Sequence, residues 1–289
     1  MRVGFSRAWS WAGLAGGAFL SLTGPLLAGP AGAQTRPERV VSLNLCADQL
    51  LLRLADREQI ASLSPLARDA DLSFLAREAQ AVPVNEGRGE AILYAGADLV
   101  LTGRFGSHTK RELLQRHGLE VLVLDPWRNI AQGREQIRTV AARLGHPERG
   151  EALVREIDAA LAQTKEIVPR GKTLLTYHRR GWVPGPDSIT GEIARHMGFT
   201  LHQERLGLAR GGLVRLETVV AVPPDYGLID GADARAVDNG SALLVHPALA
   251  DALPPDRRLT IPDRLTLCGG PSIPAAIDAL AAEVRAKVR

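Results

Sequence analysis

The chain has 289 residues, 45% of them hydrophobic, and a formal net charge of +3. Residues 1–33 hold Arg2 and Arg7 but no acidic residue, so without them 33 Lys and Arg face 32 Asp and Glu and the net charge falls to +1. A nearly neutral chain presents no sizeable basic field, and this excludes nucleic acid as an expected partner.

The N-terminal run has the layout of a secretory signal peptide, because residues 8–35 carry no charged side chain. A membrane anchor is the alternative, since the run exceeds the roughly 20 residues that a spanning helix needs. However, glycines and prolines interrupt it, and Ala31-Gly32-Ala33 offers a small-x-small cleavage site. We expect residues 1–33 to be cleaved. No Cys follows Leu26-Leu27-Ala28-Gly29, where a lipoprotein would be attached, so we expect a soluble periplasmic protein.

Apolar runs of strand length then alternate with segments of helical periodicity, which indicates an α/β fold with parallel strands. Between residues 34 and 146 the predicted strands are 39–45, 60–63, 98–102 and 120–124. The predicted helices of this part are 46–55, a short one beginning near residue 89, 110–116 and 130–144. We predict an N-terminal α/β lobe over residues 34–146.

The pattern changes after residue 146. Residues 147–168 contain no strand-like run, and Leu153, Ile157 and Leu161 fall on one stripe at helical spacing. Prolines at positions 147 and 169 bracket the segment. We predict one long bridging helix within residues 147–170, which at about 1.5 Å per residue would span on the order of 30 Å and join two lobes.

The alternation restarts at residue 171. The predicted strands are 172–177, 226–229, 242–245 and 258–261, and the predicted helices are 188–197 and 271 to the C-terminus. We predict a C-terminal α/β lobe over residues 171–289. The whole chain is then two Rossmann-like lobes with central parallel sheets and a ligand cleft between them.

Motifs for phosphate binding, metal chelation and nucleophilic catalysis are incomplete. Gly171-Lys172-Thr173 resembles the end of a phosphate loop, but position 166 is Glu and a strand follows. The seven His form no metal-binding spacing, and no G-x-S-x-G is present. We expect neither a resident cofactor nor an enzyme. An exported α/β enzyme, a hydrolase or metal-dependent, and a metal-ion binding protein stay as alternatives.

Polar and aromatic side chains follow the predicted strands, and open α/β sheets bind ligands beyond the carboxyl ends of their strands. The candidate ligand-binding residues are Asn44, Cys46, Arg104, Phe105, Trp127, Tyr177, His178, Arg180, Trp182 and Arg264. Each could instead pack at the edge of its lobe, and residues 178–182 could form a solvated loop. Together, Trp, Phe and Arg at converging strand ends suit a large, flat, partly anionic ligand.

The two cysteines, Cys46 and Cys268, both fall at strand-to-helix junctions, one in each predicted lobe. A disulfide between them would persist in an exported protein, but it requires Cα atoms within about 7 Å. Two unreactive thiols are an alternative. A third is a thiolate at a helix N-terminus that contacts the metal of a ligand.

Several short stretches follow one another along the chain: Arg39-Val40-Val41-Ser42-Leu43-Asn44, Gly89-Glu90-Ala91-Ile92, Ala97-Asp98-Leu99-Val100, Leu216-Glu217-Thr218-Val219, Pro224-Asp225 and Leu267-Cys268-Gly269-Gly270-Pro271. Their order resembles that of the periplasmic substrate-binding proteins of the cobalamin and ferric-siderophore class, which feed ABC importers. The resemblance covers residues 37–288, and it rests on order and spacing because each stretch is short.

The resemblance implies a protein that captures a metal chelate and delivers it to an ABC importer permease dimer. Cobalamin is favoured, because the Asn-Leu-Cys and Cys-Gly-Gly-Pro contexts look closer to the cobalamin branch; a ferric siderophore or haem comes next, so the ligand may carry cobalt or iron. It also implies a monomer in which Glu90 and Glu217 dock on Arg residues of the permease. A carboxylate in a helix's first turn is favoured there and stays exposed. Each Glu could instead be an ordinary capping residue.

Overall fold

The computed structural model describes residues 35–229 and 240–289. The predicted signal peptide at residues 1–33 lies outside this range. Within it, no helix combines the length and the apolar character needed to cross a membrane. The predicted α/β class with two parallel sheets is confirmed.

The N-terminal lobe is built on a four-stranded parallel sheet in the order β2-β1-β3-β4. Its strands are β1 (Val40–Ser42), β2 (Ile60–Ser62), β3 (Leu99–Gly103) and β4 (Glu120–Leu124). Its helices are α1 (Leu45–Leu54), α2 (Ala76–Ala79), α3 (Gly89–Tyr94), α4 (His108–Arg116) and α5 (Ile130–Leu144), with 3-10 turns η1 (Arg57–Gln59) and η2 (Pro65–Arg68). The two central strands are buried in all but the last residue of β3, as expected for strands covered on both faces.

The C-terminal lobe is built on a second parallel sheet in the order β10-β9-β5-β7, with an antiparallel pair of β6 and β8 beside it. Its strands are β5 (Thr173–Thr176), β6 (Trp182–Pro184), β7 (Thr200–Leu201), β8 (Gly211–Leu213), β9 (Tyr226–Leu228) and β10 (Arg258–Leu259). Its helices are α7 (Ile189–Met197), α8 (His202–Arg205), α9 (Leu216–Ala221), α10 (Pro247–Ala252) and α11 (Ile273–Lys287), with 3-10 turns η3 (Arg179–Gly181), η4 (Pro255–Arg257) and η5 (Asp263–Leu265).

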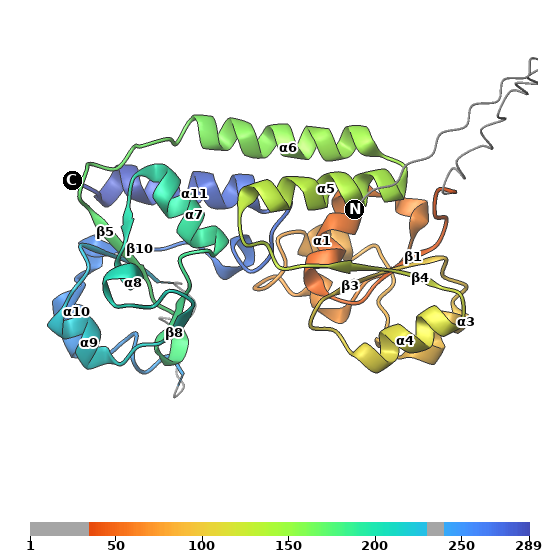
Figure 1. Cartoon of the computed structure of the whole chain (residues 1–289), viewed down its shortest axis with the longest axis horizontal. Helices are drawn as coiled ribbons and strands as arrows, with labels where there is room; N and C mark the ends of the chain where they lie inside the picture. Colours follow the sequence, from red (N-terminus) through yellow and green to blue (C-terminus); the bar gives the residue numbers. More distant parts are fainter. Residues whose placement is uncertain (1–34, 230–239) are drawn as a thin grey trace, which may run out of the picture. The chain divides into compact units, whose positions relative to one another are not determined.

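Helix α6 (Pro147–Ala162) connects the two sheets and lies against both α5 and α11 (Figure 1). It is shorter than predicted, because the chain leaves the helix at Gln163 and Glu166 takes a left-handed backbone conformation with φ of 53°. Val168, which lies within the segment predicted to be helical, is still buried in the core. The apolar periodicity of the sequence therefore extends past the end of the helix, because residues after the helix are buried as well.

The predicted strand at residues 242–245 is wrong. The segment forms turns, in which the Leu244 N–H donates to the Ser241 carbonyl over 2.8 Å. Leu244 is fully buried in the small core of the C-terminal lobe, so its apolar character anchors a turn and not a strand. Strands β6, β7 and β8, of two or three residues each, were not predicted.

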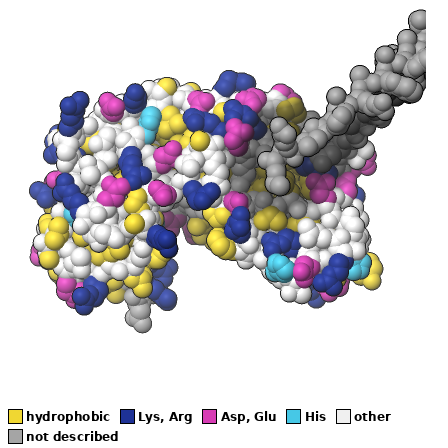
Figure 2. All heavy atoms as spheres, in the orientation of Figure 1, with side chains coloured by type: hydrophobic (Ala, Val, Ile, Leu, Met, Phe, Trp, Pro, Cys, Tyr) yellow, Lys and Arg dark blue, Asp and Glu magenta, His cyan; other side chains and the backbone are white. Residues whose placement is uncertain are grey.

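The hydrophobic core is continuous across the two lobes. One buried cluster includes Val40 and Leu101 of the first sheet, Leu174 and Leu228 of the second, and Ile277 of α11. On the opposite side from α6, the surface is hollowed between the part that carries β8 and α9 and the part that carries α3 and α4 (Figure 2). The two lobes therefore share a core along the long helices and part from each other on the far side.

Candidate functional site

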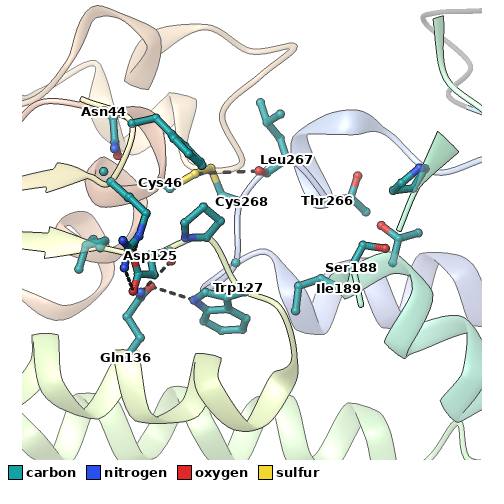
Figure 3. Close-up of a pocket in the computed structure, with 18 of the residues that line it drawn as sticks. Asn44, Cys46, Asp125, Trp127, Gln136, Ser188, Ile189, Thr266, Leu267 and Cys268 are labelled. Atoms are coloured by element: carbon teal, nitrogen blue, oxygen red, sulfur yellow. Dashed lines mark hydrogen bonds and ion pairs between the residues drawn. A yellow bond between two sulfur atoms is a disulfide. The ribbon is translucent and has the colours of Figure 1, made fainter. Parts of the chain in front are cut away.

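A pocket of about 730 Å³ lies between the lobes and is lined by residues of both. Its lining comes from the ends of β1, β3 and β4 in the N-terminal lobe. The C-terminal lobe contributes residues that follow β5, the strand β6, the start of α7 and the segment between η5 and α11. This is the carboxyl edge of both parallel sheets, where the loops that follow the strands converge on one space. Figure 3 shows Asn44 and Asp125 on one side of it and Ser188 and Ile189 on the other.

Asn44 links β1 to α1 and lines the pocket. It has an extended backbone, and its side-chain oxygen accepts a hydrogen bond from the Ala47 N–H over 2.8 Å, which makes it the N-cap of α1. A Cβ at Gly103 would lie 2.3 Å from the Asn44 Nδ2, so the glycine at the end of β3 permits this close approach. The Asn44 side chain is therefore held in place before any ligand binds.

Arg104 and Asp125 form an ion pair across the ends of β3 and β4. The guanidinium donates through both Nε and Nη2, with Nη2 at 2.9 Å from Asp125 Oδ2. The hydrogen bond from Arg104 lowers the pKa of Asp125 below its ordinary value. This bidentate geometry fixes the direction of an Arg whose side chain is 63% exposed.

Trp127 is the best-anchored aromatic residue of the pocket. It is 8% exposed, and its Nε1–H donates to Gln136 Oε1 of α5 over 2.9 Å. Gln136 in turn donates to the Asp125 carbonyl over 2.9 Å, so α5 fixes the loop after β4 (Figure 3). The indole lies against two glycines, because a Cβ at Gly133 or at Gly269 would fall 2.2 Å from it.

The C-terminal side of the pocket carries a more exposed aromatic surface. Trp182 is 46% exposed and stands on β6, where it pairs with Leu213 of β8. His178 precedes it and lines the pocket as well. Ser188, Ile189 and Thr190 complete this side at the start of α7, where the Ser188 hydroxyl caps the helix by accepting from the Gly191 N–H.

Cys46 and Cys268, for which the sequence left three states open, are joined by a disulfide with 5.2 Å between their Cα atoms. Both line the pocket. The short separation is reached because the loop after β1 and the loop before α11 meet at the same edge of the two sheets.

Seven of the ten predicted ligand-binding residues line the pocket: Asn44, Cys46, Arg104, Phe105, Trp127, His178 and Trp182. Tyr177 does not. It is fully buried in the second core, and its hydroxyl donates to the Val214 carbonyl over 3.0 Å. Tyr177 directly follows β5, where its N–H still donates to the Leu228 carbonyl of β9 over 3.0 Å, and its side chain packs into the second core instead of reaching the pocket.

Arg180 and Arg264 also lie outside the pocket lining. Arg180 has a left-handed backbone with φ of 57°, and its side chain is exposed. Arg264 is exposed in η5, one residue after the pocket residue Asp263. Arg180 lies between the pocket residues His178 and Trp182, and Arg264 directly follows the pocket residue Asp263, but neither Arg lines the pocket itself.

Several lining residues were missed. Gln136 lies in the middle of α5, and no local pattern shows which face of that helix meets the loop after β4. Ser188 begins the predicted helix 188–197 and Thr266 stands outside the predicted elements, and neither has a sequence signal for the pocket. Asp125 could have been chosen, because it directly follows β4 and precedes Trp127 by two residues. Within residues 35–229 and 240–289, no group of three or more His, Cys, Asp and Glu is placed to hold a metal ion.

Comparison with known proteins decides the family. A family model described as periplasmic binding protein matches residues 40–255. This chain is a member of the periplasmic binding protein family. A curated relative, the cobalamin-binding protein of Halobacterium salinarum, is 24% identical over 224 residues, which are 74% of this chain and 59% of that protein. The chain therefore spans 59% of the length of the curated relatives that it matches.

Solved structures share the fold of this periplasmic binding protein. The periplasmic heme-binding protein RhuT of Roseiflexus sp. RS-1, in apo form, has a TM-score of 0.70 at 22% identity, covering 86% of this chain and 97% of that one. A possible iron-binding (periplasmic solute-binding) protein of Staphylococcus epidermidis has a TM-score of 0.70 at 14% identity, covering 86% and 99%. At these identities the likeness establishes the two-lobed fold.

Proposed function

We propose that this periplasmic binding protein captures a metal-chelate ligand, a corrinoid such as cobalamin in preference to a ferric siderophore or haem, and delivers it to the permease of an ABC importer. The pocket between the lobes carries the proposal. Its volume is in the range of sites that enclose organic ligands, and Trp182 and Phe105 offer exposed aromatic faces to a flat ring. The family and the relative are named for binding, which supports a binding role over an exported enzyme.

The charge of the pocket favours the corrinoid. Among the lining residues in the described part of the chain, the Asp, Glu, Lys and Arg side chains are Arg104, Asp125 and Asp263, so these residues carry no excess of positive charge. Haem bears two propionates and catecholate siderophores are anionic, and burying such groups requires matching cations. A corrinoid ring is fringed with neutral amides, which lining side chains such as Asn44, Gln136 and Ser188 can hydrogen-bond.

The test is a titration of the mature protein with cyanocobalamin, a ferric siderophore and haemin in separate experiments. Binding is measured by Trp fluorescence and by calorimetry. We expect cyanocobalamin to bind most tightly, with a change in the emission of Trp182. Tighter binding of haemin would overturn the corrinoid assignment, and absence of binding by all three would overturn the capture role.

The docking role of Glu90 and Glu217 is supported by matching local structure in the two lobes. Glu90 stands in the first turn of α3 and Glu217 in the first turn of α9, and both are exposed. Eight residues after each Glu an Asp begins the following strand. Asp98 accepts from the Glu38 and Arg39 N–H groups, and Asp225 accepts from the N–H and the hydroxyl of Thr173. The same unit therefore presents one carboxylate on each lobe.

Charge reversal tests the docking role. The Glu90→Arg/Glu217→Arg variant should lose transport through the cognate permease while it keeps its ligand affinity, because neither residue lines the pocket. Glu148→Arg is a matched control, since Glu148 also stands in the first turn of a helix, α6. Full uptake by the double variant would contradict the assignment.

Export of the chain belongs to the same proposal. Removal of residues 1–33 in the periplasm would leave a monomer that begins close to the first described residue, Thr35. N-terminal sequencing of the protein isolated from the periplasm tests this, and an uncleaved N-terminus would contradict it.

A further inference from the structure

The disulfide between Cys46 and Cys268 joins the two lobes inside the ligand pocket. Cys46 lies in the first turn of α1, directly after β1 of the first sheet. Cys268 lies between η5 and α11, after β10 of the second sheet. The two residues are 222 positions apart in the sequence, and both line the pocket. The bond therefore crosses from one wall of the pocket to the other.

Non-covalent contacts hold the same junction. The backbone of Gly269, the neighbour of Cys268, lies against the indole of Trp127, since a Cβ there would fall 2.2 Å from the ring. A second contact joins the lobes nearby, where the Ile130 N–H at the start of α5 donates to Glu192 Oε2 of α7 over 2.5 Å. The disulfide is thus the covalent member of a set of inter-lobe contacts beside the pocket.

Such a bond limits how the pocket can open. It keeps the Cα atoms of residues 46 and 268 at 5.2 Å, so the lobes cannot separate at this edge while it is intact. Since differences in affinity among related complexes lie mostly in the dissociation rate, a restraint on opening acts mainly on ligand release.

The two cysteines differ in exposure. Cys46 is partly exposed and faces the pocket, whereas Cys268 is 2% exposed. A reductant can reach the bond through the pocket at Cys46, and a ligand that fills the pocket would block that route. Thiol–disulfide exchange requires such access to the attacked sulfur.

We propose that the Cys46–Cys268 disulfide is an inter-lobe restraint that slows ligand release, and that a bound ligand protects it from reduction. The chemistry is exchange with a dithiol. One thiolate of the dithiol attacks a sulfur of the disulfide, which forms a mixed disulfide and releases one cysteine. The second thiol of the dithiol then attacks the mixed disulfide and releases the other cysteine. Two electrons and two protons pass to the protein, which leaves two cysteine thiols and an oxidised dithiol. The part that concerns ligand rests on the proposed function.

The restraint is tested first without ligand, by hydrogen exchange of the oxidised and the dithiothreitol-reduced protein. We expect amides around residues 43–47 and 266–270 to exchange about tenfold faster after reduction, because local opening becomes easier there. Circular dichroism of the reduced protein is the control for a persistent fold, and reoxidation should restore the slow exchange. Unchanged exchange would overturn the restraint, whatever the ligand is.

Ligand release is tested with cyanocobalamin on the native protein and on the Cys46→Ser/Cys268→Ser variant. Its dissociation should be about tenfold faster from the variant and from the reduced native protein than from the oxidised native protein. Equal rates would overturn the role in release. Absence of cyanocobalamin binding in the oxidised native protein would instead contradict the proposed function and leave the exchange result standing.

Protection is tested by the appearance of thiols under dithiothreitol. We expect reduction to be at least about tenfold slower with saturating cyanocobalamin, because the ligand covers the approach to Cys46. Thiols of the unfolded protein, which offers no pocket, serve as the control and should appear at the same rate with and without cyanocobalamin. Equal rates for the folded protein would overturn the protection.

Discussion

The two walls of the pocket differ in how firmly their side chains are held. On the N-terminal wall, Asn44 caps a helix, Arg104 and Asp125 are paired, and Trp127 is hydrogen-bonded and packed on glycines. On the C-terminal wall, Trp182 is 46% exposed on a two-stranded ribbon. The comparison indicates that one wall is formed before the ligand arrives, while the other keeps apolar surface for the ligand to cover. Substitutions on the first wall should cost stability, and those on the second should cost affinity.

The largest effect is expected for Trp127→Ala. The indole is 8% exposed and fills the space between Gly133 and Gly269, so its removal leaves a cavity in the core. We expect a loss of about 3–5 kcal/mol in the free energy of unfolding, measured by urea denaturation of the oxidised protein. A loss below about 1 kcal/mol would show that the N-terminal wall is not held by this residue.

Asp48 gives the same wall a pH-dependent stability. It is fully buried in α1, and burial raises its pKa to about 6, even though hydrogen bonds from Ser42 and Ser64 oppose the shift. Because its folded-state pKa lies above the unfolded value, the carboxyl binds its proton more tightly in the folded protein. Stability from this group is therefore lost as the pH rises from about 4 through about 6.

The Asp48→Asn variant measures this effect. At about 1.4 kcal/mol per pH unit, ionisation of Asp48 costs about 3 kcal/mol, which the neutral amide avoids. We expect the variant to be more stable than the native protein at pH 8 and the difference to vanish near pH 4, in urea denaturation across that range. A difference that does not depend on pH would contradict the burial argument.

Trp182→Ala should separate affinity from stability. The side chain is half exposed, so we expect less than about 1 kcal/mol of change in unfolding free energy. If it stacks on the ligand, cyanocobalamin affinity should fall about tenfold, or about 1.4 kcal/mol, in a calorimetric titration. Unchanged affinity would remove Trp182 from the binding surface and weaken the contrast between the walls.

The smallest effect is expected for Arg104→Ala. An ion pair at this exposure contributes little to stability, so urea denaturation should show almost no change, and loss of the Arg should raise the pKa of Asp125 toward its ordinary value. Arg116→Ala is the matched control, because Arg116 forms a similarly exposed pair with Glu112 on α4. A loss of ligand affinity above about a hundredfold would show that Arg104 binds an anionic group directly, and would favour haem or a siderophore.

Residues in the loops that follow the strands of the first sheet were the most predictable part of the site. β4 and α5 have the bounds predicted from their apolar pattern, and the loops that follow β1, β3 and β4 carry the predicted residues to the pocket. Tyr177 does not reach the pocket, because its ring packs in the second core and its hydroxyl donates to the Val214 carbonyl, a contact that no local pattern shows. Arg180 and Arg264 do not line the pocket, because they stand in short turns whose side-chain directions cannot be predicted from a periodic pattern.

The α/β class, most helices and strands, and the loops that meet at the pocket could be predicted from the sequence, because these follow from local periodicity. The Cys46–Cys268 bond, the hydrogen bond of Trp127 to Gln136 and the contact of Gly269 with the same ring appear only in the folded chain. Each of these contacts joins residues distant in the sequence or on separate elements. The disulfide and the Gly269 contact depend on how the two lobes meet along α5, α6 and α11, and the Gln136 contact depends on how α5 packs on the loop after β4.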